Sequence, residues 1–315
     1  SAPPTPPCSG HGTSSVVVRP ATMSCLALLG CGALAAKLCH KIYKVKNKPV
    51  NAEPNYDDEG ATGNVYVLIL TLDYKRTDRP LTSSADGRNM HQLFLACGVP
   101  SENITWMRDE QCTHEAVVAA IEEVGGKCGE DDYFIFYYSG HGTTFEDLDG
   151  DESDGQDEAF CLVDAQGQIS YETCLTDDAF AEVVTSSVEQ DAKIIILTDC
   201  CHSGTIADFE HDNWAGRRAV SIAGCLDHQD SGDVGKGGIF THSMLMAVER
   251  LAKKGMKDYS VGELYNVTLE IDDSVFASEQ DICLQCPPGH LPNQMAWPLI
   301  PRHRYTAPSD WRPQR

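Results

Sequence analysis

Three six-residue runs dominated by apolar side chains constrain the fold of this chain more than any other feature. They are 65–70 (VYVLIL), 133–138 (YFIFYY) and 193–198 (KIIILT). Continuous apolar runs of this length are typical of strands that are buried on both faces, as in a parallel sheet covered by helices on each side. The runs therefore predict a buried central sheet.

Segments with helical periodicity separate these runs. The predicted helices are 85–96, 113–124, 177–184, 240–253 and 261–271, and shorter strands are predicted at 104–107 and 220–224. Strands that alternate with helices pair in parallel through right-handed crossovers, which place helices on both faces of the sheet. We therefore predict an α/β fold: a three-layer sandwich with a mostly parallel central sheet.

The composition of the first 60 residues differs from that of the rest. Residues 1–60 are Pro-rich, then apolar, then Lys-rich, which indicates an arm outside the folded domain, and residues 306–315 are predicted to be a tail. The apolar stretch within 21–38 is shorter than the ~20 residues that span a bilayer. A membrane anchor, a processed leader and a flexible arm all remain open for this stretch.

Charge and cysteine content narrow the class of protein. The 47 acidic and 24 basic residues give a formal charge of −23, which repels phosphate backbones and makes nucleic acid a poor partner. The 14 cysteines are scattered along a long chain, which favours reduced thiols and a cytoplasmic location. Cys283 and Cys286 lack a second ligand pair at zinc-finger spacing, so we expect them in a loop near solvent.

Two of the buried runs lead into polar turns that contain glycine. The turn at 139–142 reads SGHG, and the turn at 199–204 reads DCCHSG. In open parallel sheets, sites form beyond the carboxyl ends of the strands. We therefore expect His141 and Cys201 to face each other across a cleft.

A cysteine beside a histidine suits nucleophilic catalysis. The thiolate is the nucleophile, and the imidazole can accept the thiol proton and later donate it to a leaving amine. The backbone N–H groups of Gly142 and Cys201 are the candidates for an oxyanion hole.

The two motifs, YSGHG at 138–142 and DCCHSG at 199–204, resemble the signature motifs of metacaspases, the caspase relatives of plants, fungi and protists. The resemblance covers about residues 64 to 300. It implies a caspase-like peptidase domain over 61–305, with a large-subunit-like part at 61–210 and a small-subunit-like part at 218–305, as in type I metacaspases. It makes Cys201 the nucleophile, because Cys201 directly precedes His-Ser-Gly, and leaves a packing role for Cys200.

The same resemblance implies a substrate class and an activating metal. Metacaspases cut after Arg or Lys, and the residues that match the family's basic-residue pocket are Asp86, Ser139 and Asp199. The residues that match the family's activating calcium site are Asp157, Asp177, Asp178 and Asp208. The segment 145–158 is predicted to be one long acidic loop. Its acidic run at 146–155 does not itself have EF-hand spacing, because no register supplies both the glycine and the final glutamate.

The sequence thus predicts a calcium-activated cysteine endopeptidase whose partners are protein substrates that contain basic residues. Calcium is expected to activate the enzyme and not to take part in the chemistry, and a monomer is favoured. The alternative is a catalytically idle caspase-like scaffold that binds other proteins. The intact pair of His141 and Cys201 argues against that alternative.

Overall fold

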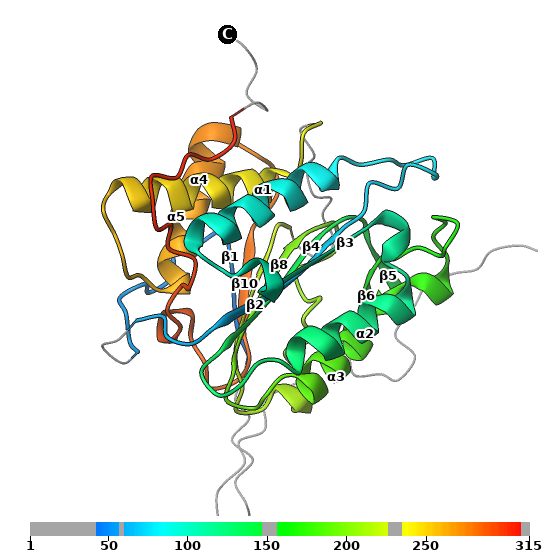
Figure 1. The fold of residues 1–315 in the computed structure, drawn as a ribbon, viewed down its shortest axis with the longest axis horizontal. Helices are drawn as coiled ribbons and strands as arrows, with labels where there is room; N and C mark the ends of the chain where they lie inside the picture. Colours follow the sequence, from blue (N-terminus) through cyan, green and yellow to red (C-terminus); the bar gives the residue numbers. More distant parts are fainter. Residues whose placement is uncertain (1–41, 57–59, 147–155, 226–234, 310–315) are drawn as a thin grey trace, which may run out of the picture. The chain divides into compact units, whose positions relative to one another are not determined.

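The computed structural model describes residues 42–56, 60–146, 156–225 and 235–309, all of which belong to one compact unit, His40–Arg315. Its central sheet has seven strands in the order β1-β10-β9-β8-β4-β2-β3 (Figure 1). The strands are β1 (Tyr43–Lys46), β2 (Val65–Thr71), β3 (Ile104–Arg108), β4 (Tyr133–Ser139), β8 (Lys193–Asp199), β9 (Arg218–Ala223) and β10 (Cys283–Cys286). The five strands from β9 to β3 in this order are parallel to one another, whereas β10 and β1 are added antiparallel at one edge.

Helices cover both faces of this sheet. They are α1 (Ser83–Cys97), α2 (His114–Gly125), α3 (Asp177–Ser187), α4 (Ile239–Lys253) and α5 (Val261–Ile271). Figure 1 shows α1, α4 and α5 on one side of the sheet and α2 and α3 on the other. The predicted three-layer α/β architecture is confirmed.

The alternation of side chains along β2 explains why the sheet needs two helical layers. Val67 and Ile69 are fully buried in one core with residues of α1, α4 and α5, whereas Leu68 and Leu70 are fully buried in the other core with residues of α2 and α3. Successive side chains of a strand point to opposite faces, so a wholly apolar strand is stable only when both faces are covered.

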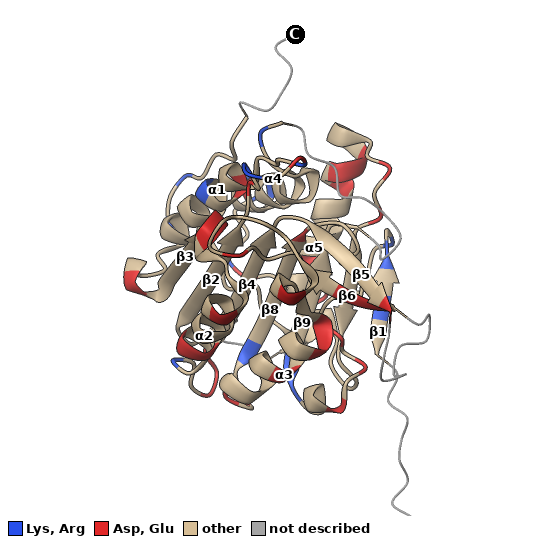
Figure 2. Cartoon of the chain, turned by 90° about the vertical axis from the view of Figure 1, so that its right-hand side faces the viewer, with Lys and Arg blue, Asp and Glu red and all other residues tan. Residues whose placement is uncertain are grey.

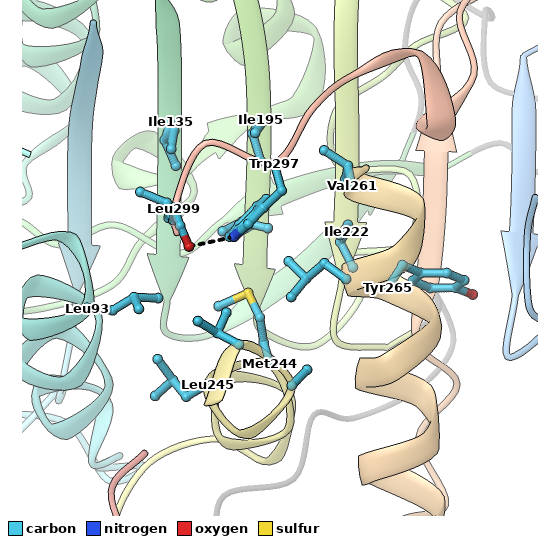
Figure 3. Packing of buried hydrophobic residues seen from close by; sticks show 14 of the residues in the cluster. Leu93, Ile135, Ile195, Ile222, Met244, Leu245, Val261, Tyr265, Trp297 and Leu299 are labelled. Atoms are coloured by element: carbon cyan, nitrogen blue, oxygen red, sulfur yellow. Dashed lines mark hydrogen bonds between the residues drawn. The ribbon is translucent and has the colours of Figure 1, made fainter. Parts of the chain in front are cut away.

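The segment near the C-terminus completes the first of these cores. Trp297 is buried among side chains of the sheet and of α4, and its indole N–H donates a hydrogen bond to the Leu299 carbonyl oxygen at 3.1 Å (Figure 3). The polar edge of this large ring is thereby satisfied inside an apolar core, as a buried tryptophan requires. Residues that are far in sequence from the cysteine motif therefore pack against the central sheet that carries this motif.

A smaller antiparallel sheet has the order β5-β6-β7. Its strands are β5 (Gly142–Glu146), β6 (Gln156–Phe160) and β7 (Leu175–Thr176). The sequence predicted one acidic loop over 145–158. Both ends of that segment are instead paired strands, and residues 147–155 lie outside the described part of the chain.

Two segments that the sequence placed outside the sheet form its edge. Residues 43–46, assigned to the N-terminal arm, form β1, and residues 283–286, expected in a loop near solvent, form the buried strand β10. The expectation of a loop at Cys283 and Cys286 is wrong. Both segments are short, so their apolar pattern is too brief to stand out from irregular chain.

Candidate active site

The two polar turns leave the sheet side by side. β4 and β8 are parallel neighbours, and their register pairs Ser139 with Asp199. His141 and Cys201 each follow two residues later, and both line a cleft of about 590 Å³. The strand ends therefore bring together the two residues that the sequence predicted to be catalytic.

The imidazole of His141 has a fixed orientation. Its Nε2 lies 2.8 Å from the carbonyl oxygen of Arg79. Because a carbonyl oxygen only accepts hydrogen bonds, Nε2 carries the proton and Nδ1 keeps the lone pair that can accept a proton from a thiol. The Arg79 carbonyl also remains available to stabilise the imidazolium that forms when Nδ1 is protonated.

Two buried tyrosines hold the backbone of His141. The Tyr74 hydroxyl accepts a hydrogen bond from the His141 N–H at 2.9 Å, and the Tyr138 hydroxyl donates to the His141 carbonyl oxygen at 2.7 Å. The Tyr74 ring also lies against the imidazole, with centroids 4.5 Å apart. Every polar backbone group of His141 is thus engaged, which limits how far the ring can move.

The two adjacent cysteines have different environments. Cys201 is half-buried on the cleft, whereas Cys200 is fully buried, and burial raises the pKa of the Cys200 thiol well above its usual value. A buried thiol of raised pKa stays protonated and is a poor nucleophile. Exposure therefore favours Cys201 as the nucleophile.

The backbone around Cys201 is tightly packed. A Cβ atom at Gly142 would lie 1.9 Å from the carbonyl oxygen of Cys201, so this close approach requires glycine. His202 has a φ of 52°, in the left-handed region. Strained backbone of this kind persists where the surrounding structure holds it, and it is frequent at active sites.

The three residues predicted to bind a basic side chain lie together. The Ser139 hydroxyl donates to an Asp86 carboxylate oxygen at 2.9 Å, and Asp199 accepts from the Thr241 N–H and hydroxyl at 2.9 and 2.7 Å. Asp86, Ser139 and Asp199 are all buried. Burial raises the pKa of the nearby Tyr137 hydroxyl, and the charges of Asp86 and Asp199 raise it further.

Two glycines cover these carboxylates. The Gly238 N–H donates to both Asp86 oxygens at 3.1 and 3.0 Å. A Cβ atom at Gly237 would lie 2.0 Å from an Asp86 oxygen, and one at Gly238 would lie 2.1 Å from an Asp199 oxygen. The close approach of these glycines to Asp86 and Asp199 has no signal in the sequence pattern.

The four aspartates predicted to bind calcium are spread over three segments. Asp157 is in β6, Asp177 and Asp178 begin α3, and Asp208 follows the cysteine turn with a φ of 40°. Burial, followed by the charges of Asp178 and Asp208, raises the pKa of Asp177 to about 7. Several carboxylates of one sign therefore repel each other here, which is the charge pattern that a cation relieves.

These aspartates do not form a finished ligand set in this conformation. Within the described ranges, no three His, Cys, Asp or Glu side chains converge on a point where a metal ion could lie. The buried Glu158 belongs to the same cluster, since its N–H donates to Asp177 at 3.1 Å and its carboxylate accepts from the Thr205 hydroxyl. The sequence reasoning missed Glu158. Figure 2 shows acidic residues on β6 and around α3.

Two further candidate segments are the cysteine pair at 283 and 286 and the apolar stretch at 21–38. Cys283 and Cys286 are three positions apart in one strand, so their side chains point to opposite faces and cannot share a metal ion. Among the residues that the structure describes, no helix is long and apolar enough to cross a bilayer. The apolar stretch at 21–38 lies outside those residues.

Comparison with known proteins adds a family likeness. A family model described as the metacaspase, peptidase C14 domain, matches residues 67–210. Metacaspase-1 of Candida glabrata is 30% identical over 158 residues, which cover 48% of this chain and 39% of that protein. Metacaspase III c of Phaeodactylum tricornutum is 28% identical over 173 residues (52% and 50%), and Metacaspase-1 of Arabidopsis thaliana is 30% identical over 154 residues (40% and 41%). The chain thus spans half or less of the length of these relatives.

A solved structure has the same fold. The crystal structure of a Geobacter sulfurreducens protein matches with a TM-score of 0.53 and 22% identity, covering 71% of this chain and 92% of that one. At this identity the likeness concerns the fold alone.

Proposed function

We propose that this chain is a caspase-like cysteine peptidase, and that it is a calcium-activated endopeptidase that cuts after Arg or Lys, because a metacaspase peptidase C14 family model matches residues 67–210. One observation carries this proposal. His141 and Cys201, which are 60 positions apart, line one cleft, and the Arg79 carbonyl orients the imidazole so that Nδ1 can take a proton.

The proposed reaction uses these groups in sequence. Nδ1 of His141 takes the thiol proton of Cys201, and the sulfur attacks the carbonyl carbon of the scissile peptide bond. The N–H groups of Gly142 and Cys201 are proposed to stabilise the oxyanion. The imidazolium then protonates the leaving amine, and water hydrolyses the acyl-enzyme with the imidazole again acting as the base.

The preference for Arg or Lys is proposed from the buried carboxylates. Asp86 and Asp199 supply two negative charges close to the strand ends, and Ser139 and Thr241 hold their positions. A guanidinium pairs well with carboxylates that are fixed in this way. Gly237 and Gly238 pack closely against these carboxylates, so we expect their backbone to shift when a basic side chain binds.

Cleavage of fluorogenic peptides tests this function. With millimolar calcium, we expect hydrolysis of peptides that end in Arg or Lys and little hydrolysis of matched peptides that end in Asp. Equal turnover of Arg and Asp peptides would contradict the specificity. No turnover of any peptide by a correctly folded chain would favour the idle scaffold.

Calcium is proposed to bind the carboxylate oxygens of Asp157, Asp177, Asp178 and Asp208. Oxygen ligands in flexible arrangements suit calcium, and the negative charges of Asp178 and Asp208 add to the effect of burial in raising the pKa of Asp177. When bound, the ion would neutralise this charge. Asp208 lies seven positions after Cys201. A calcium ion held by Asp208 would therefore restrain the loop that carries the nucleophile.

We expect Asp178→Ala to raise the calcium concentration needed for half-maximal binding at least about tenfold, because one ligand in four is lost. The readout is the fluorescence of Trp214, which is buried against Phe209 with ring centroids 4.9 Å apart and lies near Asp208. Asp191→Ala removes an exposed carboxylate and is the matched control. Full peptidase activity in the presence of a chelator would contradict the calcium proposal.

A further inference from the structure

Two cysteines lie opposite each other at the end of the small sheet. The antiparallel register of β6 and β7 pairs Ala159 with Thr176 and Phe160 with Leu175. One further step along this register places Cys161 opposite Cys174. The two segments stay side by side beyond them, because the Thr173 hydroxyl donates to the Leu162 carbonyl oxygen at 2.9 Å.

This placement suits a disulfide. Residues directly opposite in antiparallel strands have Cβ atoms about 4.5–5.5 Å apart, and a disulfide needs about 3.5–4.5 Å. A small local movement is therefore enough to join the two sulfurs. Both residues are free thiols in this structure and both are buried, at 5% and 8% exposure. The proposed peptidase mechanism uses neither of them.

Cys161 contacts the machinery around His141 directly. It lines the same cleft as His141 and Cys201, and its N–H donates to the His141 carbonyl oxygen at 3.1 Å. The Tyr74 hydroxyl, which accepts from the His141 N–H, donates to the Cys161 carbonyl oxygen at 2.6 Å. Tyr138 bridges the same two carbonyl oxygens, at 2.7 and 3.3 Å. A displacement of Cys161 therefore moves the groups that hold the imidazole.

We propose that Cys161 and Cys174 are a redox-sensitive dithiol, and that their closure to a disulfide by exchange with glutathione disulfide lowers the reactivity of the His141 and Cys201 pair. This inference adds regulation to the proposed peptidase. Its chemical part, the formation of the disulfide, does not depend on peptidase activity.

The exchange is balanced in atoms and electrons. The sulfur of Cys174 loses its proton and attacks glutathione disulfide, breaking its S–S bond and releasing one glutathione thiolate that takes up the proton. Cys161 then loses its proton and attacks the Cys174 sulfur of the mixed disulfide, displacing the second glutathione, which takes up that proton. Two protein thiols are oxidised, and glutathione disulfide is reduced to two glutathione molecules.

The ionisation of the pair agrees with this order. A hydrogen bond between the two side chains raises the pKa of Cys161 and lowers the pKa of Cys174. Cys174 is thus the thiol that is more readily deprotonated, which suits the group that attacks glutathione disulfide in the first step.

The disulfide is tested by equilibrating the full-length chain in glutathione buffers of increasing oxidation, blocking the remaining thiols with iodoacetamide, and analysing the peptides by mass spectrometry. We expect a cross-linked peptide that contains Cys161 and Cys174 and that dithiothreitol removes. Cys174→Ser is expected to abolish this cross-link. Cys128→Ser, at a buried thiol that contacts the Val124 carbonyl oxygen, is the matched control and should leave it unchanged.

The effect on the catalytic pair is measured as the rate at which iodoacetamide alkylates Cys201. Closure of the disulfide should slow this rate at least about tenfold, since a misplacement of about 1 Å can cost on the order of 10²-fold in reactivity. In Cys174→Ser the same buffers should leave the rate unchanged, which separates the dithiol from direct glutathionylation of Cys201.

The outcomes separate this inference from the proposed function. The inference is overturned if a folded chain never forms the cross-link. It is also overturned if oxidation slows the alkylation of Cys201 equally with and without Cys174. A chain that forms the cross-link and slows at Cys201 but cleaves no peptide supports the switch and contradicts the proposed peptidase.

Discussion

Replacing Cys201 by alanine is expected to abolish peptide hydrolysis, with a loss of at least about 10⁴-fold in turnover, because the variant lacks the sulfur that attacks the peptide bond. Cys200→Ala should retain most of the activity. The Cys200 thiol is buried and its pKa is raised, so it is a packing group behind the nucleophile. The measurement is the rate of hydrolysis of an Arg peptide at saturating calcium, with the thermal unfolding of both variants recorded.

His141→Ala should be nearly as inactive as Cys201→Ala, and the double variant should lose little more, because a nucleophile and its base act as a unit. Cys200→Ala is expected to cost stability by about 1 kcal/mol, as most buried truncations do, with little effect on turnover. An inactive Cys200→Ala beside an active Cys201→Ala would reverse the assignment of the nucleophile.

The second large effect is expected at the pocket. Asp86→Asn should lower kcat/KM for Arg and Lys peptides by about 10²-fold, which corresponds to about 2.7 kcal/mol of transition-state stabilisation. The asparagine keeps the shape and one acceptor oxygen for the Ser139 hydroxyl and the Gly238 N–H, so the change removes mainly the charge that pairs with the basic side chain.

A matched carboxylate is available as a control for this substitution. Asp73 is also buried near the start of α1, where it accepts from the Ser84 N–H at 2.7 Å, but it pairs with Lys75 at 2.7 Å. Asp73→Asn should leave the ratio of Arg to uncharged peptides unchanged. The rate of Cys201 alkylation should be normal in Asp86→Asn. An unchanged ratio in Asp86→Asn would remove Asp86 from the pocket.

The parts of the fold that could be predicted have strong local patterns. The central parallel strands and the helices between them were predicted because long apolar runs and helical periodicity depend on neighbouring residues alone. β1, β7 and β10 were not predicted. They have 4, 2 and 4 residues, so each is a strand only because a partner strand lies beside it.

The same distinction applies to the candidate site. His141 and Cys201 stand in turns that follow recognisable strands, so their meeting at one edge of the sheet follows from topology. The Arg79 carbonyl, which orients the imidazole, has no side-chain signature at all. Gly237 and Gly238, which cover the carboxylates, were missed because only tertiary structure shows which backbone approaches another.

The pairing of β1 with β10 has a consequence for the order in which the chain is assembled. Tyr43 pairs with Cys286, 243 positions later. At roughly 5–20 residues per second, a ribosome needs on the order of 10–50 s to make the intervening chain. During that time β1 has no partner strand, and once β9 has been made its edge stays unpaired until β10 follows. Contacts of such high sequence separation form late and slowly, so the emerging domain depends on protection of that edge until its last strand has been translated.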